Sequence, residues 1–354
     1  MTEIILKNYL TSFLSAFLIS VILTYLIRLL VLKLKILDQP GEPRKIHPVP
    51  VPALGGLAIF LTYFLVMLIF SRYGFLTDGR ITFQHLTGII IGGALLMIGG
   101  YFDDKYSLKP QQTFIWPVLA ALVMVFSGLS LHYITNPFGG LLFFGSSWLG
   151  SILVFLWLLG IMYTTKFLDG LDGLVSGITG IGALILFVVS LFWDKPLSGT
   201  SILCLILAGA AFGFLVWNFN PAKIFLGEGG SLFLGFMLGV LSLISGAKIA
   251  TALLILGIPI LDVAWVIARR VFKEKKSAFL GDRKHLHFRL LDAGFNQRQA
   301  VLFLYLLTLL FGTASLFQQT IGKLITLGIL LIVMICLALW LIVRYQNQQN
   351  KLSD

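Results

Sequence analysis

The chain has 354 residues, of which 58% are hydrophobic and 12% are charged, with a mean hydropathy of +0.96. Soluble domains carry roughly 25% charged residues, so this composition excludes an ordinary soluble domain and indicates a membrane protein with several spans. The net charge is +11, and the two cysteines, Cys204 and Cys336, both lie in apolar runs, which excludes a disulfide framework.

Apolar runs separated by short polar breaks follow one another along the whole chain. The first run has no small-residue cleavage site, and we interpret it as a retained helix rather than a signal peptide. We predict an all-α, polytopic integral membrane protein with about 10–11 transmembrane helices in a single domain, residues 1–354. The candidate spans are roughly 9–31, 53–71, 86–102, 113–133, 147–166, 174–193, 201–217, 231–247, 249–268, 299–317 and 324–344.

Lysine and arginine are distributed unevenly between the breaks. Most of the 26 lie on the side of the membrane that holds loop 33–52 and the basic, histidine-containing loop 269–298. By the positive-inside rule this side is cytoplasmic, so we expect a cell-membrane protein with its N-terminus outside and its C-terminus inside. We expect no nucleic-acid partner. The polar motifs all fall on the same side, namely HPVPVPALGG, the Asp103–Asp104 pair, FLDGLDGL, NPAKIFLGEGGS and DRKHLHFRLL.

Asp169 and Asp172 lie in the motif FLDGLDGL, between two apolar runs. On a helical turn this i, i+3 spacing would put both carboxylates on one face, about 5–6 Å apart. Two like charges beside a bilayer are costly, and a cation between them would remove the cost. Gly170 and Gly173 leave room for a ligand to approach the backbone. The alternative is a short polar turn whose acids are solvated.

Asp103 and Asp104 end an apolar run, where the carbonyl groups of a helix disfavour acids. Either Lys105 or a bound Mg²⁺ would compensate their charge, and a solvated loop start is the alternative. Because Mg²⁺ takes a few carboxylates and leaves its other positions to water and phosphates, four aspartates exceed the need of one ion. Some of them are therefore expected to act as a base or to support the ligands.

The motif NPAKIFLGEGGS ends in glycines that precede a helix, which Ser231 is expected to cap. A helix N-terminus opened by glycines suits phosphate oxygens. Glu228 can join a metal site there, and Phe225 offers an aromatic face to a base. Close packing of helices is the alternative interpretation of the glycines.

His285 and His287 lie among the basic residues Arg283, Lys284 and Arg289. The alternate spacing would put both imidazoles on one side of an extended segment. This cationic cluster suits a diphosphate or a lipid phosphate. A juxtamembrane patch for anionic lipid is the alternative.

Asp262 lies inside the predicted span 249–268. An acid within a membrane span is a candidate functional residue. Arg269 and Arg270, about two turns further on, make a structural ion pair an equal alternative.

In their order and spacing these motifs resemble those of the polyprenyl-phosphate N-acetylhexosamine-1-phosphate transferases, over nearly the whole chain. The closer resemblance is to the bacterial branch that makes undecaprenyl-diphosphate-GlcNAc for O-antigen and teichoic acid. It implies a cytoplasmic site that depends on Mg²⁺ or Mn²⁺ and transfers sugar phosphate from a UDP-N-acetylhexosamine to undecaprenyl or another polyprenyl phosphate, releasing UMP. The other expected partners are membrane lipid and a second copy of the chain in a homodimer, which is compatible with the resemblance.

The resemblance also implies roles for individual residues. Asp103 is a candidate base or metal-organising group, Phe225 matches a position that packs on uracil, and the two histidines match a loop near the diphosphate. The expected metal ligands are Asp103, Asp104, Asp169, Asp172 and Glu228. The expected catalytic groups are Asp103, Asp104, Asp169, Asp172, His285 and His287, and the expected substrate contacts are Lys166, Asn218, Phe225, Gly227, Arg283 and Arg289.

Four positions, in three motifs, depart from the pattern of the family. The family usually has Asp, a metal ligand, where this chain has Glu228, and Asn where it has Tyr163 and Lys166. A further histidine is common where Phe288 stands.

Two other functions stay open as alternatives. A transporter or flippase would place polar residues deep in the spans and on both faces, and a CDP-alcohol-type phosphotransferase would have a longer acidic motif than FLDGLDGL.

Overall fold

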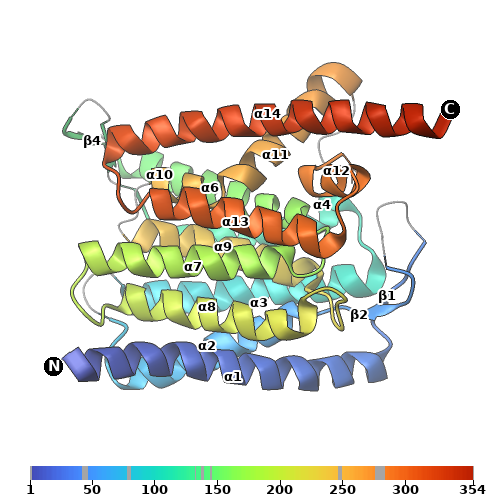
Figure 1. Cartoon of the computed structure of the whole chain (residues 1–354). Helices are drawn as coiled ribbons and strands as arrows, with labels where there is room; N and C mark the ends of the chain where they lie inside the picture. The colour runs from blue at the N-terminus through green and yellow to red at the C-terminus, as the bar shows by residue number, and fades with distance from the viewer. Residues whose placement is uncertain are drawn as a thin grey trace.

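The structure is a computed structural model that describes residues 2–41, 47–77, 81–131, 133–136, 139–143, 146–245, 249–275 and 284–353. Most helices run alongside one another in a bundle, with α1 on one side and α14 on the opposite side (Figure 1). The helices are α1 (Thr2–Leu34), α2 (Gly56–Arg72), α3 (Phe83–Tyr106), α4 (Pro110–Thr113), α5 (Ile115–Phe126), α6 (Ser147–Leu168), α7 (Leu174–Trp193), α8 (Gly199–Asn218), α9 (Gly227–Ile244), α10 (Ile249–Ile255), α11 (Gly257–Ala268), the π-helical turn η1 (Arg269–Glu274), α12 (Leu286–Asp292), α13 (Gln297–Ala314) and α14 (Thr320–Ser353).

The predicted fold class is confirmed, because each of the eleven predicted spans coincides with one or two helices. In the described ranges, 8 helices are long and apolar enough to cross a membrane, or 9 if α10 and α11 together form one span. The remaining two predicted spans are the shorter apolar helices 56–72 and 110–126. The protein is therefore a multi-pass membrane protein, as its composition indicates.

Two predicted spans differ from the observed helices for local reasons. The span 249–268 is broken, and its two halves meet at an angle of 79°. Pro259 has no N–H and its ring clashes with the carbonyl group four residues earlier, so α10 ends at Ile255. The span 113–133 is too long at its end, because Gly128 adopts φ 93° after α5 ends at Phe126.

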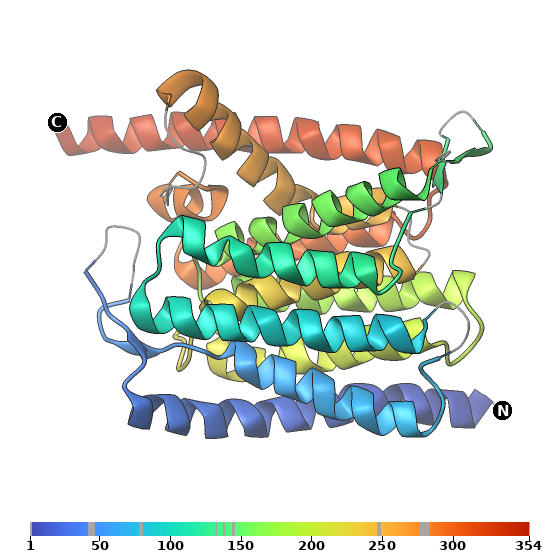
Figure 2. The same ribbon diagram turned by 180° about the vertical axis from the view of Figure 1, so that it is seen from behind.

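The centre of the bundle is formed by α8 and α9, whose residues are almost all buried. α9 contacts α2, α3, α6 and α7, while α1 and α7 cover α8. Seen from behind, α3 and α5 lie in front of this centre, and α11 leaves the bundle obliquely (Figure 2). The start of α2 and the ends of α3 and α6 come close to the first turn of α9.

Two short antiparallel strand pairs connect helices. β1 (Leu37–Asp38) pairs with β2 (Val51–Pro52), and β3 (Tyr133–Thr135) pairs with β4 (Leu141–Phe143). The first pair lies at the same end of the bundle as α4 and α12, and β4 lies at the opposite end (Figure 1). β2 leads directly into α2, and the carbonyl group of Pro52 accepts a 2.8 Å hydrogen bond from the N–H of Phe225. The hydrogen bond between Pro52 and Phe225 thus joins the predicted motifs HPVPVPALGG and NPAKIFLGEGGS.

Candidate active site

The aspartates at the end of α3 lie against the first turn of α9. Oδ1 of Asp104 accepts a 3.2 Å hydrogen bond from the backbone N–H of Glu228, and Gly227 packs against the same carboxylate. Oδ2 of Asp104 is buried and has no hydrogen-bond partner within the described ranges. Oδ1 of Asp103 instead accepts a 3.1 Å hydrogen bond from the N–H of Leu108, in the chain that follows α3. Asp104 is therefore the member of the pair that is built into the helix junction.

Glycines make this junction of α2, α3 and α9 possible. A β-carbon on Gly100 would overlap the backbone of Gly229, and a β-carbon on Gly56 would overlap the backbone of Gly230. Small residues let helices approach until their backbones touch. The helix already begins at Gly227, so Ser231 lies inside it and the prediction that Ser231 caps it is wrong. Close packing, the alternative interpretation, is what the structure shows for these glycines.

The second pair of acids lies in a turn between α6 and α7. α6 ends at Leu168 and α7 begins at Leu174, so Asp169 and Asp172 are not on a helical turn and that prediction is wrong. Gly173 has φ 80°, a left-handed conformation that an L-residue with a side chain adopts only with strain. The glycine therefore shapes the turn.

Asp169 is the acid whose charge the surrounding protein stabilises least. Crowding by protein atoms and repulsion from Glu228 and Asp172 raise the pKa of Asp169 above its usual value. The residue itself remains exposed to solvent. The charge of Asp169 also acts on Asp104, as do the charges of Asp103 and Glu228. The predicted acids therefore form one electrostatic cluster, in which a cation would relieve the mutual repulsion.

Asp172 is held differently. Its Oδ2 accepts hydrogen bonds from Nδ2 of Asn220 at 2.9 Å and from the N–H of Ala222 at 3.0 Å. The backbone carbonyl of Asn220 accepts in turn from Nε of Arg298 at 2.9 Å. Asn220 was not predicted as a site residue, although it lies in the motif NPAKIFLGEGGS. Asp172 therefore joins the α6–α7 turn to the segment that precedes α9.

Asn218, a predicted substrate contact, is buried and bonded within the protein. Its Oδ1 accepts hydrogen bonds from the N–H of Gly173 at 3.1 Å and from the hydroxyl of Ser176 at 3.0 Å. Its Nδ2 donates to the carbonyl of Ile224 at 3.0 Å. In this arrangement Asn218 fixes the position of the same turn rather than presenting its amide to a ligand.

Lys166 and Glu228 form an ion pair across α6 and α9. Their side chains are largely shielded, with exposed fractions of 24% and 15%. The ammonium of Lys166 also lies 5.7 Å from the centre of the Tyr163 ring. The two charged residues are two of the positions at which the chain departs from the family pattern. In the structure, the longer acid therefore meets a cation supplied by the neighbouring helix.

The two histidines lie side by side at the start of α12. Their rings are stacked, with centroids 5.6 Å apart and planes 5° apart. The segment is not extended as predicted, because His285 is the residue before the helix and His287 lies in its first turn. Nδ1 of His285 is 2.9 Å from Oδ2 of Asp262, and Oδ1 of Asp262 accepts a 2.8 Å hydrogen bond from the N–H of Leu286. Asp262 thus orients His285, a pairing that the sequence did not indicate.

His287 is buried, and neither of its ring nitrogens has a hydrogen-bond partner among the residues that the structure describes. Burial lowers its pKa to about 3, so the imidazole is neutral at physiological pH. The ring packs directly against Gly170, where a β-carbon would overlap Nε2. His285 also stacks on Phe167, with ring centroids 6.0 Å apart. The histidine cluster therefore contacts the turn that carries Asp169.

Phe225 closes another side of the site. Its N–H and carbonyl group are bonded to Pro52 and Gly55, at 2.8 and 2.9 Å. Its ring meets the ring of His47 edge-on, with centroids 5.1 Å apart, and His47 bonds to Asp38 at 3.0 Å. The half-buried ring of Phe225 is thus held in place by the motif HPVPVPALGG.

The positions of the remaining predicted residues say less about how the site works. Arg289 lies in α12, and its N–H donates to the carbonyl group of His285 at 3.1 Å. Arg283 lies outside the described residues. Lys105, offered as a partner for the α3 acids, donates instead to the hydroxyl group of Tyr101 at 3.0 Å.

Whether these residues fit a divalent cation can be judged from their bonding. Over the part of the chain that the structure describes, no group of three His, Cys, Asp or Glu side chains is close enough to hold an ion by itself. Mg²⁺ often uses only one or two carboxylates and completes its shell with water and substrate phosphates. Asp104 and Asp169 fit that role. Asp172, bonded by two N–H groups, and Glu228, paired with Lys166, fit it less well.

Similarity to known proteins extends over nearly the whole chain. Residues 86–246 match the family described as glycosyl transferase family 4. The chain is 33% identical over 330 residues to the probable undecaprenyl-phosphate N-acetylglucosaminyl 1-phosphate transferase of Bacillus subtilis, covering 92% of this chain and 88% of that protein. It is 33% identical to the decaprenyl-phosphate N-acetylglucosaminephosphotransferase of Mycolicibacterium smegmatis, covering 85% and 80%. It is 30% identical to the undecaprenyl-phosphate α-N-acetylglucosaminyl 1-phosphate transferase of Thermotoga maritima, covering 85% and 88%.

The fold and the site together define a class of protein. It is a multi-pass membrane protein in which acids, a lysine and histidines from separate helices meet at one end of the bundle. Within that class, the chain belongs to the polyprenyl-phosphate N-acetylglucosamine-1-phosphate transferases of glycosyl transferase family 4. The resemblance inferred from the motifs is confirmed.

Proposed function

We propose that the protein transfers N-acetylglucosamine 1-phosphate from UDP-N-acetylglucosamine to undecaprenyl phosphate, or another polyprenyl phosphate, and releases UMP. The observation that carries the proposal is the cluster of Asp104, Asp169 and Glu228, in which acids from α3, the α6–α7 turn and α9 meet at one end of a membrane bundle. The printed names of the relatives support the substrates. The step would be the first membrane reaction of a cell-envelope polysaccharide.

The reaction exchanges one phosphoanhydride for another. An oxygen of the lipid phosphate attacks the β-phosphorus of the sugar nucleotide and forms a new P–O bond. The bond between the β-phosphorus and the bridging oxygen breaks, and UMP leaves with that oxygen and its electron pair. Two anions must be brought together, so positioning and charge stabilisation supply most of the rate enhancement.

The residues of the site divide this work. Asp104 and Asp169 would hold Mg²⁺ or Mn²⁺, which when bound supplies positive charge to the phosphates. Lys166 adds a fixed cation at the same place, held by Glu228. The ring of Phe225 offers a stacking surface for the uracil base. Neutral His287, next to the turn that carries Asp169, can donate or accept one hydrogen bond at the diphosphate.

The acid-bearing end of the bundle is proposed to face the cytoplasm. The distribution of Lys and Arg supports this orientation, since most of them flank that end. α1 begins at one end of the bundle and α14 finishes at the other (Figure 1). An outside N-terminus and an inside C-terminus agree with this arrangement.

Two radiolabelled donors test the proposal in membranes that contain the protein and undecaprenyl phosphate. With the label on the β-phosphate of UDP-N-acetylglucosamine, radioactivity should move into a chloroform-soluble product. With the label on the α-phosphate, it should remain in water as UMP. Asp169→Asn membranes are the matched control. If neither UDP-N-acetylglucosamine nor another UDP-N-acetyl sugar yields lipid-bound phosphate, the proposal is wrong and a carrier without transferase activity becomes the better description.

A further inference from the structure

The first turn of α13 contacts the segment that precedes α9. Oε1 of Gln297 accepts a 2.6 Å hydrogen bond from Nδ2 of Asn220, and Nε of Arg298 donates to the backbone carbonyl of the same asparagine at 2.9 Å. Nδ2 of Asn220 also donates to Oδ2 of Asp172 at 2.9 Å. Two consecutive residues of α13, neither of them predicted as a site residue, therefore fix the asparagine that bonds to the α6–α7 turn.

Tyr305, about two turns further along α13, reaches the α6–α7 turn itself. Its hydroxyl donates a hydrogen bond to the carbonyl group of Gly173, and its ring lies against Gly177, where a β-carbon would overlap the ring atoms. The two glycines are four positions apart, so they are neighbours on one face at the start of α7 and leave room for the ring. Gly173 also donates its N–H to Oδ1 of Asn218 at 3.1 Å. Both backbone groups of Gly173 are therefore bonded.

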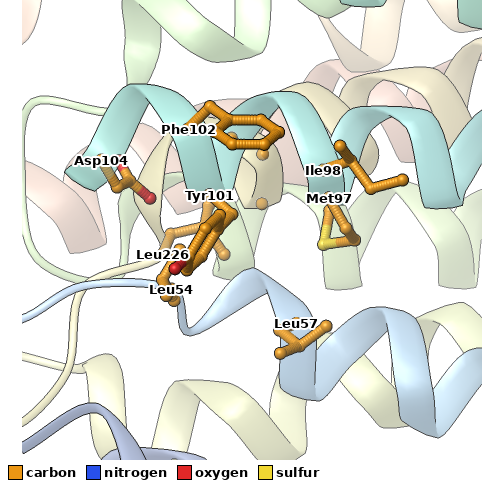
Figure 3. A pocket seen from close by; sticks show the side chains of 11 residues that line it. Leu54, Leu57, Met97, Ile98, Tyr101, Phe102, Asp104 and Leu226 are labelled. Carbon is orange, nitrogen blue, oxygen red and sulfur yellow. The ribbon is translucent and has the colours of Figure 1, made fainter. Parts of the chain in front are cut away.

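This restraint matters because the side chain of Asp169 is not held by bonds of its own. Within the described ranges its carboxylate makes no hydrogen bond, and Glu228 and Asp172 repel it. Asp104 differs, because it lines a pocket at the end of α3 together with Leu226 (Figure 3), and its Oδ1 accepts a hydrogen bond from the N–H of Glu228. The place of Asp169 in the acid cluster therefore depends on the backbone of its turn, which would otherwise move to relieve the repulsion.

We propose that Tyr305 is a positioning residue of the transferase, whose hydroxyl fixes Gly173 and thereby holds Asp169 in the acid cluster. This inference rests on the proposed function. Gly173 is four residues from Asp169 and is the point at which the turn becomes α7, so a bond to its carbonyl group fixes one end of the turn. Near the other end, His287 packs against Gly170. Tyr305 acts through the backbone of the turn and not on the substrates.

Removing the hydroxyl of Tyr305 should slow the reaction more than it weakens substrate binding. In Tyr305→Phe the ring still fills the space beside Gly177, and we expect kcat to fall about tenfold while the KM for undecaprenyl phosphate changes less than about twofold. Tyr9→Phe is the matched control, because the hydroxyl of Tyr9 accepts hydrogen bonds from the N–H of Leu197 at 2.8 Å and from the hydroxyl of Ser201 at 3.3 Å, beyond the far end of α7. Both variants should lose similar thermal stability, but Tyr9→Phe should keep its kcat.

Hydrogen–deuterium exchange measures the restraint on the turn without relying on catalysis. Peptides that contain residues 169–177 should take up deuterium faster in Tyr305→Phe than in the unmodified protein, because Gly173 is then free to move. The same peptides should be unchanged in Tyr9→Phe. Gln297→Met removes the acceptor for Asn220 and keeps the length of the side chain, and it should give a smaller loss of kcat in the same direction.

Three results would overturn the inference: an unchanged kcat in Tyr305→Phe, unchanged exchange of the turn in that variant, or an equal loss of kcat in Tyr9→Phe. Failure of the proposed function gives a different pattern. The unmodified protein would then form no lipid product, while the exchange of the turn would still respond to the loss of the Tyr305 hydroxyl.

Discussion

The acidic side chains at the junction of α3 with α9 and at the start of α12 differ in how the protein stabilises their charge. At the junction, Asp104 has an oxygen that lacks a hydrogen-bond partner among the described residues, and Asp169, in the α6–α7 turn, is repelled by Glu228 and Asp172. At the start of α12, Asp262 of the neighbouring helix α11 has both oxygens bonded, one to His285 and one to the N–H of Leu286. The junction is therefore built to receive charge from outside, whereas the charge of Asp262 is already matched by hydrogen bonds within the protein.

Removal of divalent cations should have the largest effect, and only through the junction. EDTA in excess should lower lipid-product formation by about 10³-fold or more, because the acids and the two anionic substrates then repel one another without compensation. Readdition of Mg²⁺ or Mn²⁺ should restore the rate. Full activity in EDTA would show that Lys166 suffices as the cation of the site.

Asp169→Asn should come next, with a loss of about 10³-fold in kcat. The amide removes the charge at the acid that the protein supports least, while similar size keeps the turn intact. The melting temperature should not fall, because removing a repelled carboxylate relieves repulsion from Glu228 and Asp172. A variant that unfolds, or one that retains activity, would contradict the assignment of Asp169 to the cation.

Lys166 and Glu228 should behave as one unit. Lys166→Asn and Glu228→Asp each break the ion pair, and each should lower kcat by about 10- to 100-fold. The double variant, which carries the residues usual in the family at these positions, should recover much of the loss. A double-mutant cycle measures this coupling. Additive losses in the double variant would mean that the two side chains act separately.

Asp262→Asn should have the smallest effect of these changes, about tenfold in kcat. Asparagine still accepts the hydrogen bond from Leu286, but it no longer provides a charge to hold His285 in one orientation. The KM of the sugar nucleotide should stay the same if Asp262 acts through His285 alone. A loss as large as that of Asp169→Asn would place Asp262 among the groups that touch substrate.

The helices could be predicted from sequence because apolar runs of membrane length leave few alternatives. The break between α10 and α11 was missed, although Pro259 signals it, because hydropathy averages over a single proline. The motifs were expected to converge because they all lie on the same side of the membrane. In the structure, Gly170 touches His287, and Glu228 meets both Asp104 and Lys166.

The individual contacts could not be predicted, because they depend on how far one helix slides along another. Lys166 and Glu228 are 62 positions apart, and nothing in either motif states that they pair. The same holds for Asp262, whose local neighbours in sequence are arginines while its bonded neighbour is His285. Asn220 was missed since an Asn-Pro pair ordinarily marks a turn, and the hydrogen bond that its side-chain amide donates to Asp172 appears only in three dimensions.

The backbone contact of Gly100 with Gly229 has a consequence for how the enzyme can vary. Asp104 and Glu228 are positioned by the direct contact of α3 with α9 and not by the loops that follow these helices. Insertions in the connections between helices, such as the segment after Lys105, can therefore be tolerated without moving Asp104. A single methyl group added at Gly100 would push α3 and α9 apart. It would separate Asp104 from Glu228, although both residues would still be present in the sequence.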